Sequence, residues 1–234
     1  MARRSPTPPA RPRRKPPRVA DGLPTYGGEL DDDVRIEGVT VGGSWPEEQF
    51  DGVEVVGARL QNVQLTGATL ENLLLRDVVV SDAELSGASL PSAILERVRF
   101  ERCRMAGLVG TDLRATDVEL VDCQLTGAWL RGSAFERCEL SGCDLREGDL
   151  YGARLTDCRI LHSQLDGSEW STAEIRGLAL HGSSLDGLRG VEALRRLVIG
   201  SDQLIALAAP ILATLGIVVD DDFLDDDPDE PPKF

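Results

Sequence analysis

Several residue types on which active sites depend are rare in this sequence. It holds two histidines, two lysines and two methionines among 234 residues, and only 4% of its residues are aromatic. His162 and His181 lack a third metal ligand, and we interpret both as surface residues. No phosphate-binding G-x-x-x-x-G-K loop occurs, and no nucleophile is paired with a base. We therefore predict that the protein is not an enzyme and uses no metal, cofactor or small-molecule substrate.

Long apolar runs are absent as well. The N-terminus has no apolar stretch of the kind that secretory signals contain. The most apolar segment, residues 201–219, is short for a membrane span and contains proline and glycine. The five cysteines are an odd number, which suits a reducing compartment. We expect a cytoplasmic protein that does not enter a membrane.

Charge is distributed unevenly along the chain. The formal net charge is −15, yet residues 1–20 carry seven basic side chains and no acidic one. Their proline- and arginine-rich composition predicts a disordered basic arm over residues 1–25. This arm either stays solvated, folds back on the acidic body, or contacts nucleic acid or a membrane surface. Residues 220–234 predict a disordered acidic tail.

A period of five residues dominates the rest of the sequence. Every fifth residue from Phe50 to Leu185 is large and apolar at 26 of 28 positions, and the exceptions are Gly110 and Ala115. We call these positions the centres. The residue two places before each centre is usually small, and all five cysteines occupy such places. This spacing is neither helical nor that of a long strand. It predicts short extended pieces joined by turns, which bury the centres by winding into a coil.

The repeat, as in "AELSG" (83–87), "CELSG" (138–142) and "ARLTD" (153–157), resembles the pentapeptide-repeat family over roughly residues 50–190. The resemblance implies an all-β fold, a right-handed quadrilateral parallel β-helix in which four pentapeptides form one coil of 20 residues. About seven coils are expected, together with a short C-terminal helical cap. A repeat of this kind is informative about the fold and silent about function.

Residues 20 positions apart stack in such a coil at about 4.8 Å. The cysteines then form two inward columns: Cys103, Cys123 and Cys143, and Cys138 and Cys158. Parallel side chains on stacked strands do not converge on a tetrahedral metal, nor do they favour disulfide geometry. We therefore predict buried structural thiols.

Three further columns follow from the same spacing. Acidic and basic residues alternate as a structural ladder at Asp77, Arg97, Asp117, Arg137 and Asp157. Glycines recur at one corner, from Gly67 to Gly187, and predict the tightest turns on that side. At the two small centres the neighbouring inward residues are leucines, Leu108 and Leu113, which restores the volume of the core.

Both ends of the coil need covering. Residues 26–49 are predicted to form an N-terminal cap, residues 50–190 the β-helix, and residues 191–219 a C-terminal helical cap or dimerisation segment. Within the last segment, Ser201 is the expected N-cap, Pro210 the expected kink and Gly216 the stop. The segment also resembles those of family members from GC-rich bacteria, some of which dimerise through a C-terminal helix.

One side of the coil stands out as a candidate binding surface. It combines carboxylates with outward aromatic residues, a usual composition for protein-binding patches. The predicted partner-binding residues are Asp112, Trp129, Asp149, Tyr151 and Glu169.

The favoured function is a rigid scaffold for protein–protein interaction. The resemblance to the family supplies an alternative, a DNA mimic that binds DNA gyrase or topoisomerase IV as some quinolone-resistance proteins do. Direct binding of nucleic acid through the basic arm is a third hypothesis, against which the acidic body counts.

Overall fold

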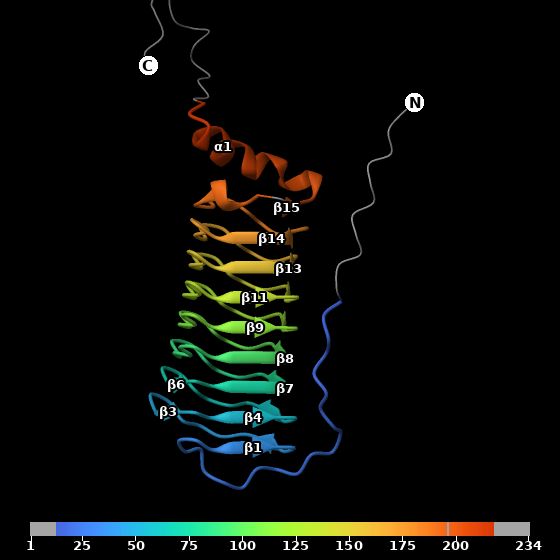
Figure 1. The fold of residues 1–234 in the computed structure, drawn as a ribbon, viewed down its shortest axis with the longest axis vertical. Helices are drawn as coiled ribbons and strands as arrows, with labels where there is room; N and C mark the ends of the chain where they lie inside the picture. The colour runs from blue at the N-terminus through green and yellow to red at the C-terminus, as the bar shows by residue number, and fades with distance from the viewer. Residues whose placement is uncertain (1–12, 196, 218–234) are drawn as a thin grey trace, which may run out of the picture.

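The chain winds into a stack of parallel coils (Figure 1). The structure is a computed structural model and describes residues 13–195 and 197–217. Val55 pairs with Leu75, and Leu75 pairs with Leu95, so that successive coils are offset by 20 residues. The predicted fold class is confirmed: a four-sided parallel β-helix with one short C-terminal helix. It has about eight turns, because a further coil precedes residue 50.

Two adjacent sides of the coil carry most of the strands. Side 1 contains β1 (Arg35–Glu37), β4 (Glu54–Val56), β9 (Arg114–Thr116) and β11 (Ala134–Glu136). Side 2 contains β2 (Thr40–Val41), β5 (Arg59–Gln61), β10 (Glu119–Val121), β12 (Glu139–Ser141) and β15 (Leu197–Val198). Four longer strands belong to both sides: β7 (Leu74–Ser81), β8 (Ile94–Glu101), β13 (Arg154–Leu161) and β14 (Glu174–Ala179).

The other two sides are held mainly by single parallel bridges. Side 3 runs through such bridges from Ser44 to Ser184. Side 4 begins with the paired strands β3 (Gln49–Asp51) and β6 (Thr69–Glu71) and continues as bridges up to Arg189. Side 4 is the side that the sequence singled out as a binding surface.

The turn between sides is the same at every corner. The residue two places after each centre has a positive φ at all 28 positions from Gly52 to Gly187. The glycine column predicted the tightest turns at one corner, and the structure has the left-handed conformation at all four corners. Asp and Asn supply nine of the 17 non-glycine residues with positive φ among the described residues, in keeping with their tolerance of this region.

The core consists of the centres and the small inward residues. The two undersized centres cause no break in the stack, since the amide of Gly110 still donates to the carbonyl of Trp129 at 2.8 Å. A Cβ on Gly110 would lie 3.1 Å from Leu130 and 3.2 Å from Leu113. Leu113, one of the two leucines in the predicted exchange, fills this space together with Leu130, and Leu108 is buried as well.

The N-terminal segments lie against the coil rather than apart from it. Residues 26–49, the predicted cap, contain β1 and β2, which pair in parallel with β4 and β5. Residues 13–25 fall within the arm predicted to be disordered, yet they have a defined place beside the stack (Figure 1). Residues 1–12 and the predicted tail at 220–234 lie outside the described residues.

The last coil is covered by two short 3-10 helices, η1 (Val191–Ala193) and η2 (Ser201–Gln203), and by α1 (Leu204–Thr214). Ser201 was wrongly expected as an N-cap: it is the first residue of η2, and no side chain caps α1. Gln203 accepts the Gly200 amide at 2.8 Å and donates to the Ser183 carbonyl at 2.6 Å, which ties η2 to the last coil. Pro210 lies inside α1 without splitting it. Gly216, with φ 70°, follows the end of the helix as predicted.

Replacing a buried centre should destabilise the whole stack. Leu145 is 1% exposed, and Leu145→Ala should lower the free energy of unfolding by about 2–5 kcal/mol through lost burial and a cavity. Arg154→Ala removes an exposed side chain from side 1 and should change the free energy of unfolding by about 0.5 kcal/mol or less. Guanidinium unfolding followed by circular dichroism measures both variants. Equal losses would contradict a core made of the centres.

Candidate protein-binding site

Four outward side chains on side 4 meet across two neighbouring coils. Trp129 and Asp149 are bridge partners, one coil apart. Arg131 follows Trp129, and Tyr151 follows Asp149, with a buried leucine between the members of each pair. Because side chains alternate along an extended segment, both flanking residues point outward. The coil spacing therefore sets the four side chains in a square.

Arg131 contacts the other three side chains of this square. Its guanidinium carbon is 5.6 Å from the centroid of the Trp129 ring and 5.7 Å from that of the Tyr151 ring. Its Nε donates to Asp149 Oδ2 at 2.7 Å, and this hydrogen bond raises the pKa of Arg131. Asp149 Oδ1 accepts the Tyr151 amide at 3.0 Å. The cation is thereby fixed against both aromatic rings.

The two aromatic side chains remain open to a partner. Trp129 is 54% exposed and Tyr151 is 46% exposed. Contacts with a cation stabilise aromatic rings in one orientation at exposed sites. A partner that packs on these rings would therefore lose less conformational entropy than one that packs on freely rotating side chains.

The remaining predicted residues lie around the cluster. Glu169 stands one coil beyond Asp149 in the same column, accepts the Ser171 amide at 2.7 Å and lies 3.4 Å from Nε of Arg189. Asp112 is at the corner beside side 4, with φ 55°, and is exposed. The structure thus brings Trp129, Asp149 and Tyr151 together and leaves Asp112 and Glu169 at the edge.

The role of Arg131 was not predicted from the sequence. The available signal was the spacing of 20 residues between Arg131 and Tyr151, which places them in one column. We define the side 4 cluster as Trp129, Arg131, Asp149 and Tyr151.

A second exposed surface lies on α1 at the end of the stack (Figure 1). Leu207 faces the coil and is buried, whereas Ile205 is 87% exposed. Leu204, Ile211 and Leu215 are also exposed, and no charged residue occurs from Gln203 to Ile217. Among the described residues, no helix has the length and apolar character to cross a membrane.

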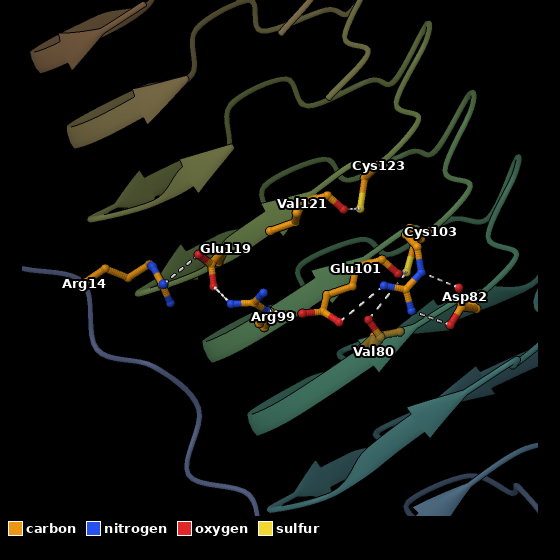
Figure 2. A network of polar contacts seen from close by, with 10 residues as sticks. Arg14, Val80, Asp82, Arg99, Glu101, Cys103, Glu119, Val121 and Cys123 are labelled. Carbon is orange, nitrogen blue, oxygen red and sulfur yellow. Dashed lines mark hydrogen bonds and ion pairs between the residues drawn. The ribbon is translucent and has the colours of Figure 1, made fainter. Parts of the chain in front are cut away.

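The cysteine columns were the other candidate for chemistry. All five thiols are free and buried. Cys103 Sγ donates to the carbonyl of Glu101 at 3.4 Å and to that of Val80 at 3.7 Å (Figure 2). Adjacent thiols and burial raise the pKa values of Cys123 and Cys138. Within residues 13–195 and 197–217, no group of three or more His, Cys, Asp and Glu side chains is arranged to hold a metal.

Residues 93–170 match the family model described as a pentapeptide repeat region. Residues 93–170 of the chain therefore form a pentapeptide repeat region. The same five-residue register and left-handed corners extend beyond the matched segment, from residue 52 to residue 187. Among curated proteins, none matches the sequence of this chain.

Solved structures of other repeat proteins are similar to it. Trypsin-treated QnrB1, a plasmid-mediated fluoroquinolone resistance protein, is 21% identical, with 76% of this chain and 100% of that chain covered and a TM-score of 0.33. HetL is a pentapeptide repeat protein involved in regulating heterocyst differentiation in the cyanobacterium Nostoc sp. strain PCC 7120. It is 17% identical, with 70% of this chain and 88% of that chain covered and a TM-score of 0.33. Similarity this low carries neither protein's role over to this chain.

The five thiols should be inert in the folded state. Burial excludes the reagent from all five thiols. For Cys123 and Cys138 a raised pKa also suppresses the thiolate, which is the reactive form. Hydrogen bonds from the neighbouring thiols instead lower the pKa values of Cys103, Cys143 and Cys158. We expect an Ellman assay at pH 8 to detect no thiol in the native protein and all five after unfolding in guanidinium. Rapid labelling of Cys123 or Cys138 without denaturant would contradict the buried columns.

Proposed function

We propose that this pentapeptide-repeat protein is a non-enzymatic, rigid scaffold that binds a protein partner through the side 4 cluster. The supporting observation is the pair of exposed aromatic rings, Trp129 and Tyr151, held by one arginine. Exposed Trp, Tyr and Arg are the residue types that most often dominate binding energy at protein interfaces. The backbone beneath them is fixed by parallel bridges on both neighbouring coils.

The chemistry of the cluster suggests the kind of partner surface. The rings offer apolar area, while Asp112 and Glu169 place carboxylates at its edge. A complementary surface would set an apolar or arginine side chain against the rings and basic residues around it. The identity of this partner, and the cytoplasmic location, stay predictions from sequence.

The gyrase or topoisomerase IV alternative also stays a prediction. A DNA mimic would present rows of free carboxylates, as a duplex presents phosphates. On side 4, however, Asp149 is bound to Arg131, and Glu169 lies within ion-pair distance of Arg189. These pairings favour the scaffold. Direct binding of nucleic acid through the arm is likewise disfavoured, because Arg14 is paired with Glu119.

We also propose that two copies of the scaffold meet through α1. The exposed apolar face of this helix is at the end of the stack, where a second copy can approach without meeting the coil. An identical apolar face is its simplest complement, as in two-fold symmetric dimers. Such a dimer would carry two side 4 clusters and could bind a partner bivalently.

A photo-crosslinker placed at position 129 should identify the partner in cells of the source organism. The matched control position is Ile94, an exposed apolar residue on side 1. With the captured partner purified, Trp129→Ala should weaken binding by about 2 kcal/mol, or about thirtyfold in Kd. Ile94→Ala should leave the Kd unchanged. The same crosslinked proteins at positions 129 and 94, or equal Kd values for the Trp129→Ala variant and the parent protein, would contradict the proposal.

Dimerisation can be measured separately by sedimentation equilibrium. The protein should sediment as a dimer, and Ile205→Lys should convert it to a monomer by placing a charge in the apolar contact. Thr214→Lys puts the same charge at the exposed end of the helix and should leave the dimer intact. A monomeric parent protein would refute this part of the proposal and would leave the side 4 cluster untouched.

A further inference from the structure

The basic arm makes specific contacts along the corner between sides 1 and 2. The Lys15 amide donates to Asp117 Oδ1 at 3.0 Å, and the Arg18 amide donates to Asp77 Oδ1 at 3.0 Å. Arg14 Nη2 lies 2.9 Å from Glu119 Oε1. Figure 2 shows Arg14 reaching from the arm to Glu119, which also binds Arg99. Both backbone and side-chain groups of the arm are therefore engaged.

The distance between these contacts fits both the spacing of the coils and the rise of a polyproline II segment. Asp77 and Asp117 are two coils apart, which is about 9.6 Å at the usual strand spacing. Lys15 and Arg18 are three residues apart, with Pro16 and Pro17 between them. Prolines favour the polyproline II conformation, in which three residues rise about 9.3 Å. Every third amide of such a segment can therefore meet every second coil.

Arginine side chains fix the orientation of the Asp77 and Asp117 carboxylates that accept these amides. Arg97 forms a bidentate pair with Asp77, at 2.7 Å for both contacts, and Arg137 does the same with Asp117, at 2.9 and 3.1 Å. Hydrogen bonds from Arg97 lower the pKa of Asp77. Burial would raise the pKa of Asp117, but the hydrogen bonds from Arg137 and from the Lys15 amide outweigh it and lower that pKa.

The site continues past the last amide contact. A cavity of about 480 Å³ adjoins the arm at Arg13 and Arg14 and is bordered by Glu139, Asp157 and Arg159. Asp157 is the next acidic residue of the same column, two coils beyond Asp117. The corner thus presents acidic groups over a longer distance than residues 13–18 cover.

We propose that the corner carrying Asp77, Asp117 and Glu119 is a binding groove for proline- and arginine-rich segments in the polyproline II conformation, and that the chain's own residues 13–18 occupy it. The groove selects segments in which two amide groups, separated by two prolines, are spaced to donate to Asp117 and Asp77. Glu119 adds an ion pair with an arginine of the segment. It is independent of the side 4 cluster.

Amide hydrogen exchange of Lys15 and Arg18, measured by NMR on the full chain, tests the groove. Asp77→Asn with Asp117→Asn keeps side-chain shape and tolerance of the left-handed corner but removes the charge. Exchange of both amides should accelerate by about tenfold or more. The matched control is Asp82→Asn, which alters the same kind of bidentate pair, with Arg102, at the next corner. Unchanged exchange in the double variant, or equal acceleration in the control, would overturn the proposal.

A second pair of variants alters only the arm, so that the coil still folds. Pro16→Gly with Pro17→Gly should accelerate the exchange of both amides, because the interval between them is no longer preset. Pro8→Gly with Pro9→Gly, outside the described residues, is the control and should have no effect. No acceleration in the first variant would refute recognition of the polyproline II interval.

The groove should also bind the segment in trans. A labelled peptide with the sequence of residues 11–20 should bind the Pro16→Gly, Pro17→Gly chain at least about tenfold more tightly than the parent chain, whose own arm competes at high effective concentration. A peptide of the same composition with its prolines dispersed should bind more weakly than the native peptide. Equal binding of the two peptides would show that charge alone attracts them and would contradict the proposal.

Discussion

The left-handed residue at every fifth position is the constraint on which the structure depends. It bends the chain after each short extended piece, and four such bends bring it back above its starting point after 20 residues. An L-residue adopts this conformation at some cost, which is why Asp, Asn and Gly recur there. Parallel hydrogen bonds to the coils on either side hold each bend in place. The columns of cysteines, of Asp–Arg pairs and of outward aromatic residues all inherit their alignment from these bends.

The sequence predicted most of the fold and part of the site. The centres could be counted from Phe50 to Leu185 because burial demands one large side chain per unit, and the exchange at Gly110 could be foreseen from volume. The corners were harder, since residues as different as Arg97, His162 and Thr172 share one backbone conformation with glycine. At those positions the hydrogen bonds of the coil override local propensity.

Contacts between columns were harder still to predict. Trp129, Asp149 and Tyr151 could be chosen from their outward phase, but the position of Arg131 between the rings depends on rotamers that no spacing rule gives. Residues 13–25 posed a different difficulty: folding back on the acidic body was one of the alternatives, but composition alone suggests disorder for a proline-rich basic segment. A matching acidic column elsewhere in the chain supplied the contacts that order it.

The pairing of carboxylates between coils explains why the basic residues of this chain are almost all arginine. Carboxylates on one coil are paired with guanidinium groups on the next, as in Asp77–Arg97, Asp82–Arg102 and Asp117–Arg137. The planar fork of arginine meets both oxygens of a carboxylate at once, which a lysine ammonium group cannot do. An acidic chain of net charge −15 thus stacks its acidic columns without strong repulsion between coils.

The match between arm and coil also bears on how this chain can evolve. Repeat proteins commonly gain or lose whole units, because a duplicated coil continues the same core. A coil inserted between Asp77 and Asp117 would separate these carboxylates by about 4.8 Å more and would leave one arm amide without its acceptor. A coil inserted beyond Asp157 would leave the arm contacts unchanged. Changes in repeat number are therefore constrained in the N-terminal half of the rod and tolerated in the C-terminal half, unless the arm lengthens with the coil.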